Sequence, residues 1–145
     1  TPKTVLEVAR DHMDVISVNF YRMTLPSEYL TLVHDITKRP VIITEFAFSE
    51  GRSAGFWKST NGAQKVLVAS QQARAEAYRA WIEESLRSPF LIGNHWFALY
   101  DYGNPDGLIG NYGLFTLEDE PYTELQTAMT QTNRDFLERW EGSFA

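Results

Sequence analysis

The stretch Val41-Ile-Ile-Thr-Glu-Phe-Ala-Phe48 decides the fold, because it is apolar at every position except Thr44 and Glu45. Such a run predicts a strand that is buried on both faces, as in a parallel sheet covered by helices. A carboxylate inside this strand must lose its hydration unless it lies at the end of the strand beside polar partners. Glu45 is therefore either a functional carboxylate or a strand-end residue that is solvated or paired with a cation.

Two further strands and four helices are expected around this stretch. Asp14-Val-Ile-Ser-Val-Asn-Phe20 is a short β-branched run, and Phe90-Leu-Ile-Gly-Asn-His-Trp-Phe-Ala-Leu-Tyr100 is the third apolar run. The helices are predicted from about Thr4 to Asp11, from an N-cap at Pro26-Ser27 to Lys38, from about Lys65 to Arg87, and after Pro121. Helices alternating with strands predict an α/β fold in which the strands run parallel.

Long loops are expected after the second and third strands, from Ser49 to Gln64 and from Asp101 to Glu120. The connections that precede the strands are short. In α/β barrels the functional face is built from the loops that follow the strands. The residues placed at that face are Asn19, Tyr21, Glu45, His95, Trp96, Tyr100 and Asp101.

Three strands of this kind cannot form a complete sheet, because two apolar edges would stay unpaired. A whole (β/α)₈ barrel takes about 250 residues, and this chain has 145. We therefore expect a single domain over residues 1–145 that is a TIM-barrel fragment of about three βα units. Either further strands complete the barrel or self-association closes the sheet.

Composition and charge argue against several functional classes for this chain. The net charge of −6, without a Lys/Arg cluster, argues against a nucleic-acid binder and is compatible with a neutral polar substrate. No apolar run is long enough to span a bilayer, so no membrane partner is expected. The absence of cysteine excludes a disulfide framework and a thiolate zinc site, and leaves the compartment open. Aromatic residues make up 14% of the chain, which suits sugar stacking as well as ordinary core packing.

The order of three motifs resembles clan A glycoside hydrolases. Pro40-Val-Ile-Ile-Thr-Glu-Phe-Ala47 is similar to their seventh strand, which ends in the nucleophilic Glu, and Asp14-Val-Ile-Ser-Val-Asn-Phe-Tyr21 is similar to their sixth. Ile92-Gly-Asn-His-Trp-Phe-Ala-Leu-Tyr-Asp101, followed by Gly110-Asn-Tyr-Gly-Leu-Phe115 and Glu120-Pro-Tyr122, resembles the eighth-strand region of β-agarases and β-galactosidase-like enzymes. The resemblance runs from about Thr4 to Leu125 and identifies the chain with the C-terminal part of the barrel.

The resemblance implies a role for each site residue. Glu45 is expected to attack the anomeric carbon as the nucleophile, and Tyr21 to hydrogen-bond it and set its ionisation. Trp96 is expected to form the floor under the sugar. Asn19, His95, Asp101 and Asn111 are candidates for contacts to sugar hydroxyls, and each is equally well explained as a satisfied polar group at a strand end or turn. A carbohydrate substrate is the expected partner, of β-galactoside or agarose type.

One catalytic group of the family is missing from the sequence. Retaining hydrolysis needs a second carboxylic acid about 5–5.5 Å from the nucleophile. In clan A it is a Glu that follows an Asn on the fourth strand, and this chain contains no Asn-Glu pair. Glu50 and Asp101 are the nearest substitutes, and neither is at the matching place. We therefore expect this chain to supply the nucleophile half of an active site and to be inactive alone.

Two alternatives remain open. A barrel piece without its acid/base could be an inactive carbohydrate-binding or structural α/β module. Gly51-Arg-Ser53-Ala-Gly55 matches the Gly-x-Ser-x-Gly elbow of serine hydrolases, but that elbow joins a strand directly to a helix, whereas here Asn61-Gly62 predicts a turn first. His12, His34 and His95 fit no metal-ligand spacing, and the Gly-rich loops fit no phosphate-binding pattern, so no metal or cofactor is expected.

Overall fold

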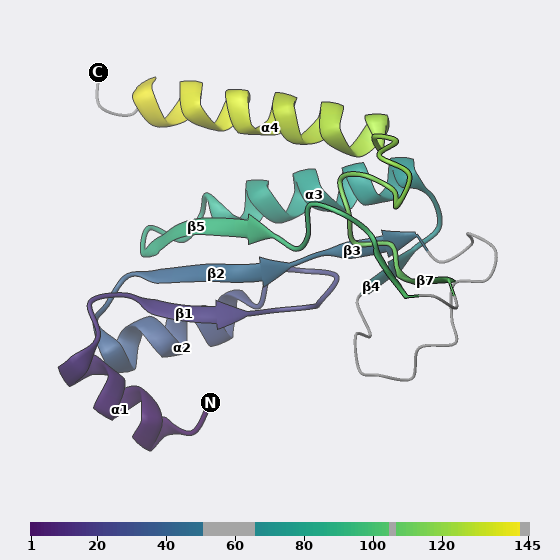
Figure 1. The fold of residues 1–145 in the computed structure, drawn as a ribbon. Helices are drawn as coiled ribbons and strands as arrows, with labels where there is room; N and C mark the ends of the chain where they lie inside the picture. The colour runs from purple at the N-terminus through teal and green to yellow at the C-terminus, as the bar shows by residue number, and fades with distance from the viewer. Residues whose placement is uncertain (51–65, 105–106, 143–145) are drawn as a thin grey trace.

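The computed structural model describes residues 1–50, 66–104 and 107–142. The chain follows the predicted alternation of helices and strands (Figure 1). The helices are α1 (Lys3–His12), α2 (Ser27–Thr37), α3 (Gln71–Ser85) and α4 (Thr123–Gly142). The strands are β1 (Ile16–Asn19), β2 (Val41–Phe46), β3 (Phe48–Glu50), β4 (Val66–Val68), β5 (Leu91–Trp96), β6 (Tyr102–Asn104) and β7 (Gly107–Gly110). Within the described ranges, no helix combines the length and apolarity needed to cross a bilayer.

The central sheet has the order β1-β2-β5, and both pairs of strands are parallel. In Figure 1 the three arrows point the same way, and α4 lies alongside α3. Helices α2 and α3 provide the two crossovers, as the alternation predicts. The mixed α/β architecture with parallel strands is therefore confirmed.

Helices cover one face of this sheet. The residues of β2 that point toward the helices are almost fully buried: Val41, Ile43 and Phe46. Phe46 stacks on Trp81 of α3 with ring centroids 5.0 Å apart, and Leu30 and Val33 of α2 belong to the same core. The alternate positions are exposed, among them Ser17, Asn19, Ile92 and His95. The sheet thus has one helix-covered face and one uncovered face.

The third predicted helix begins later than expected. Residues Val66–Val68 were predicted to belong to this helix, but they form strand β4, which pairs in parallel with β3. The β-branched valines favour a strand, and the side chain of Ser70 caps α3 by accepting a hydrogen bond from the Ala73 N–H at 3.1 Å. The predicted loop that starts at Ser49 therefore begins with strand residues.

Two other local predictions also need correction. Ser27 does not cap α2, because it is the first residue of that helix and donates a hydrogen bond to Glu84 at 2.9 Å. The third strand ends at Trp96 rather than Tyr100, and the loop that follows it contains the β6–β7 hairpin. The Gly51–Gly55 motif and the Asn61-Gly62 turn lie outside the described residues.

Candidate active site

Glu45 lies near the carboxyl end of β2, where it pairs with Asn19 of β1. The Tyr21 hydroxyl donates a hydrogen bond to its Oε2 at 2.5 Å, in a partly buried setting. This contact between a nucleophile candidate and a phenol was predicted from the sequence and is present. Burial, and then the hydrogen bond to Glu45, raise the pKa of Tyr21 far above its usual value. The phenol therefore remains a protonated donor to the carboxylate, which makes the bond charge-assisted.

Trp96 shares the strand end with Glu45 but lies on the opposite face of the sheet. It pairs with Phe46, whose side chain points toward α3, and its ring centroid is 5.4 Å from that of Phe46 and 5.9 Å from that of Tyr78. The Trp96 indole N–H donates to the Tyr112 carbonyl at 2.8 Å. Because successive residues of a strand point to opposite faces, Glu45 points away from this cluster. The described contacts of the Trp96 ring are to core residues, and its role as the floor beneath a sugar at Glu45 stays a prediction.

Phe97 lies beside Tyr21, the residue that is hydrogen-bonded to Glu45. It makes an edge contact with Tyr21 at a centroid distance of 6.2 Å. It also stacks on Tyr102 at 5.5 Å and lies 6.0 Å from Tyr112. We call Tyr21, Phe97, Tyr102 and Tyr112 the aromatic wall. The position of Phe97 could have been predicted from the sequence. Successive residues of a strand point to opposite faces, so the residue that follows the core residue Trp96 is expected to point away from the core.

Asn19 and His95 are exposed on the uncovered face. The Asn19 side-chain oxygen accepts a hydrogen bond from the Thr44 hydroxyl at 2.7 Å. His95 follows Asn94, whose side chain points the other way and accepts from the Trp81 indole at 3.0 Å. The structure therefore places Asn19 and His95 on the same side of the sheet as Glu45.

Asp101 and Asn111 are instead buried in a polar network. The Asn111 amide donates to Asp101 Oδ2 at 3.0 Å, and the Tyr122 hydroxyl donates to the same oxygen at 2.6 Å. The Gly113 N–H donates to Asp101 Oδ1 at 2.8 Å, and Asn111 Oδ1 accepts from the Glu50 N–H at 3.1 Å. The exposed fraction is only 5% for Asp101 and 0% for Asn111. The two residues therefore hold loops together rather than face a substrate.

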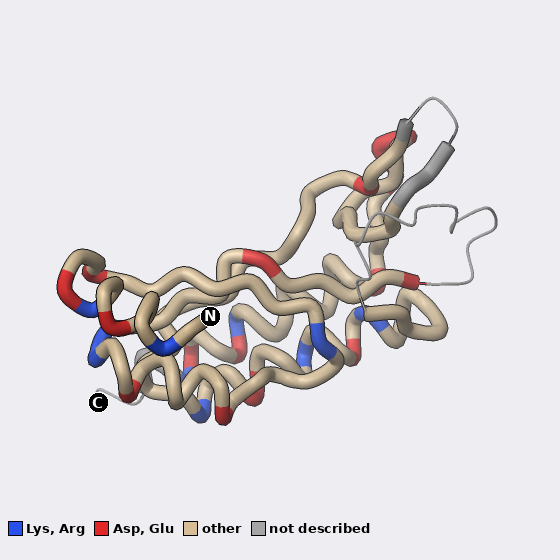
Figure 2. The backbone as a smooth tube through the Cα atoms, turned by 90° about the horizontal axis from the view of Figure 1, so that it is seen from below, with Lys and Arg blue, Asp and Glu red and all other residues tan. Residues whose placement is uncertain are grey.

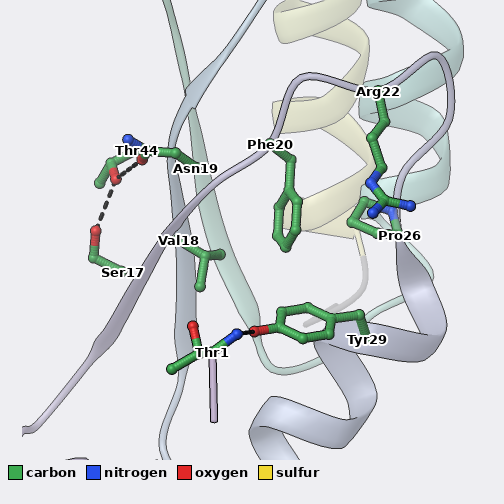
Figure 3. A pocket seen from close by; sticks show the side chains of 9 residues that line it. All are labelled: Thr1, Ser17, Val18, Asn19, Phe20, Arg22, Pro26, Tyr29 and Thr44. Carbon is green, nitrogen blue, oxygen red and sulfur yellow. Dashed lines mark hydrogen bonds between the residues drawn. The ribbon is translucent and has the colours of Figure 1, made fainter. Parts of the chain in front are cut away.

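An open pocket of about 620 Å³ runs along β1, the edge of the central sheet. Figure 3 shows Ser17, Asn19 and Thr44 hydrogen-bonded on one side of the strand and Phe20, Pro26 and Tyr29 on the other. The pocket therefore spans both faces of the sheet at its edge, which is the shape that an added strand would fill. Trp96, Asp101 and Asn111 do not line it.

Acidic and basic residues are interspersed in the part of the chain that the structure describes. Figure 2 shows basic residues spaced between acidic ones along the helices and turns that it colours. Across residues 1–50, 66–104 and 107–142, no three His, Asp or Glu side chains lie close enough to share a metal ion.

Comparison with known proteins finds β-agarases among the proteins that this chain resembles. β-Agarase B of Vibrio sp. (strain JT0107) is 31% identical over 139 residues, which is 93% of this chain. A solved structure of an exo-β-agarase matches 92% of the chain with a TM-score of 0.78 and 28% identity. The crystal structure of the agarase AgWH50C matches 93% with a TM-score of 0.79 and 29% identity. The chain is similar to these β-agarases over nearly its whole length.

The share of each relative that is matched is small. The β-agarase-like chain spans 14% of the length of β-agarase B, 18% of the exo-β-agarase and 21% of AgWH50C. A β-glucuronidase of Faecalibacterium prausnitzii, with a TM-score of 0.62 and 20% identity, shares the fold. No family model matches the chain. The predicted resemblance to β-agarases is thus confirmed for nearly the whole chain, which corresponds to a minor part of each relative.

Proposed function

We propose that the protein containing this chain is a retaining glycoside hydrolase that cleaves β-galactosidic bonds in an agarose-type galactan, with Glu45 as nucleophile. The observation that carries the proposal is the 2.5 Å hydrogen bond from the Tyr21 hydroxyl to Glu45 at the carboxyl end of a parallel strand. A partly buried carboxylate near the partly buried rings of Tyr21 and Phe97 suits a reaction on a sugar, whose apolar face stacks on aromatic rings. The similarity to agarases supports this substrate class.

We further propose that β1, β2 and β5 are strands six, seven and eight of a (β/α)₈ barrel, with residues 1–145 as one C-terminal portion of that domain. The sheet order follows the chain order, as it does in a barrel. Parallel sheets are normally covered on both faces, yet here Ile92 is 57% exposed on the uncovered face. The remaining strands of a barrel would cover this face and pair with the free edges of β1 and β5.

The reaction follows from the position of the carboxylate. An ionised Glu45 oxygen forms a bond to the anomeric carbon while the bond to the leaving oxygen breaks and that oxygen takes a proton. Water then attacks the same carbon and the glycosyl bond to Glu45 breaks, while the proton that the water loses passes to the acid/base group that protonated the leaving oxygen. The protonated Tyr21 hydroxyl holds the carboxylate in place. Asn19 and His95 are the polar groups on the same face that are available for sugar hydroxyls.

The proton donor must come from another part of the polypeptide or from a partner. Glu45 is the sole acidic residue in β1, β2 and β5, and Asp101 is engaged in its buried network. The rest of the barrel, or a second copy of the chain, is the partner that the proposal requires. The same observation favours a second candidate function, a carbohydrate-binding or structural module in which Glu45 has no catalytic role.

Hydrolysis of agarose by the full-length protein separates these two functions. We expect new reducing ends, measured colorimetrically, and an initial product that keeps the anomeric configuration of the substrate, measured by proton NMR. Binding to agarose without any reducing ends would support the binding module, and an inverted initial product would remove Glu45 from the role of nucleophile.

The aromatic wall provides a prediction that contrasts two neighbouring residues. Phe97→Ala should raise KM for galactan roughly 10-fold or more and leave the fold intact, because it removes a ring on the Glu45 face. Trp96→Ala should instead lower the free energy of unfolding by about 3–5 kcal/mol, because it leaves a cavity beneath α3. Kinetics and urea unfolding of both variants test this. The assignment of faces is wrong if Trp96→Ala is the variant that keeps its stability and loses sugar affinity.

A further inference from the structure

Arg74 is a charged side chain of α3 with 0% exposure. Its guanidinium donates three hydrogen bonds: Nε to the Phe48 carbonyl at 2.9 Å, Nη2 to the Gly113 carbonyl at 2.8 Å and Nη1 to Gln71 Oε1 at 2.8 Å. It also lies over the ring of Tyr122 at 4.9 Å and near Trp96 at 5.6 Å. Burying a charge costs free energy unless its donors are satisfied. A buried guanidinium at this position therefore suggests a role other than packing.

The two carbonyls that Arg74 joins belong to segments on either side of the candidate site. Phe48 opens β3, three residues after Glu45, and Gly113 directly follows Tyr112 of the aromatic wall. The Gly113 backbone is closely packed, since an added Cβ would come within 2.3 Å of both Asp101 N and Phe115 O. Arg74 therefore connects β3, which follows the strand that carries Glu45, to a closely packed part of the loop that carries Tyr112.

The loop is connected in turn to Phe97. The Tyr112 carbonyl accepts hydrogen bonds from the Trp96 indole at 2.8 Å and from the Ala98 N–H at 3.1 Å, on either side of Phe97. The Phe97 N–H donates to the Phe46 carbonyl at 2.9 Å. Burial lowers the pKa of Arg74 to about 10, while Asp101, Tyr122 and Glu50 favour its charged form. The guanidinium thus stays protonated at neutral pH and keeps all of these donors.

We propose that Arg74 is a positioning residue that fixes the spacing between Glu45 and the Phe97–Tyr112 side of the aromatic wall from behind the sheet. Lysine cannot replace it, because a single ammonium group lacks the planar fork that reaches two carbonyls and a side-chain amide at once. The role rests on the proposed function, since it concerns the geometry in which a sugar meets the nucleophile.

The test compares Arg74→Gln and Arg74→Lys with Arg79→Gln in the full-length enzyme. Arg79 is an exposed arginine of the same helix and serves as the matched control. Active sites are titrated with a slow 2-fluoro-galactosyl substrate, so that kcat refers to competent enzyme. Misplacement by about 1 Å costs on the order of 100-fold, and we expect that loss in kcat for both Arg74 variants with KM changed less than about threefold. Arg79→Gln should match the wild type.

Hydrogen exchange gives a readout that does not depend on activity. In Arg74→Gln, amide protection should fall roughly tenfold or more in residues 46–50 and 110–115 and stay unchanged in β1 and α1. Unchanged kcat per titrated site, uniform loss of protection, or failure of both Arg74 variants to fold would each overturn the positioning role. If the wild-type protein hydrolyses no galactan, the proposed function fails, and local loss of protection still decides whether Arg74 holds the two segments together.

Discussion

Glu45→Gln in the full-length enzyme should fold normally and lose roughly 10⁴–10⁶-fold in kcat for galactan. The amide has the shape of the carboxylate and can still accept the Tyr21 hydrogen bond of 2.5 Å. It lacks the negative charge that forms the bond to the anomeric carbon and later leaves when water attacks. Reducing-end assays over long incubations measure the residual rate, and circular dichroism checks the fold.

The control for this variant is Glu83→Gln, which alters an exposed glutamate of α3. It should keep the wild-type rate, because a solvated carboxylate on the far side of the helix takes no part in the reaction. Near-wild-type turnover of Glu45→Gln would show that Glu45 is not the nucleophile and is only a strand-end carboxylate paired with a tyrosine.

A small anion should restore part of the activity to Glu45→Ala. Azide fits the space that the side chain vacates and can attack the anomeric carbon of an aryl β-galactoside, whose good leaving group needs little protonation. The expected product is a glycosyl azide of inverted configuration, identified by NMR. This result distinguishes a missing nucleophile from a disturbed fold, because a misfolded site gains nothing from azide.

The second large effect concerns residues 1–145 as an isolated chain. Its hydrolysis of agarose should be at least about 10²–10⁴-fold slower per mole than that of the full-length enzyme, since general acid catalysis alone supplies that factor. Glu45 is the sole acidic residue of the three central strands, so they hold no second carboxylic acid to protonate the leaving oxygen. Addition of the complementary polypeptide should restore turnover if the two parts assemble.

Sedimentation provides the control for the isolated chain. Because β1 and β5 have free edges and Ile92 is 57% exposed, we expect self-association rather than a stable monomer. A well-folded monomer that hydrolyses agarose at the full-length rate would contradict both the missing acid and the incomplete sheet.

Much of the fold could be predicted because its signals are local. The apolar run around Glu45 specified a buried parallel strand, and helix periodicity placed α1 and α2 correctly within a few residues. The hydrogen bond between Tyr21 and Glu45 was implied by the resemblance to clan A glycoside hydrolases, and it is present in the structure. The start of α3 was missed, because β-branched Val66 and Val68 pair with β3, a partner distant in sequence.

The sequence by itself determined the alternation of strands and helices and the strand that carries Glu45. Only the tertiary structure decided which aromatic ring lies beside the Tyr21–Glu45 pair and that Arg74 is buried. The register of β2 against β5 shifts between Ile43 and Phe46, and a one-residue shift exchanges the two faces of a strand. The Trp96 ring packs against Phe46 and Tyr78 of the core, whereas Phe97 contacts Tyr21. Arg74, whose charge alone favours the surface, binds two carbonyls that are remote from it in sequence.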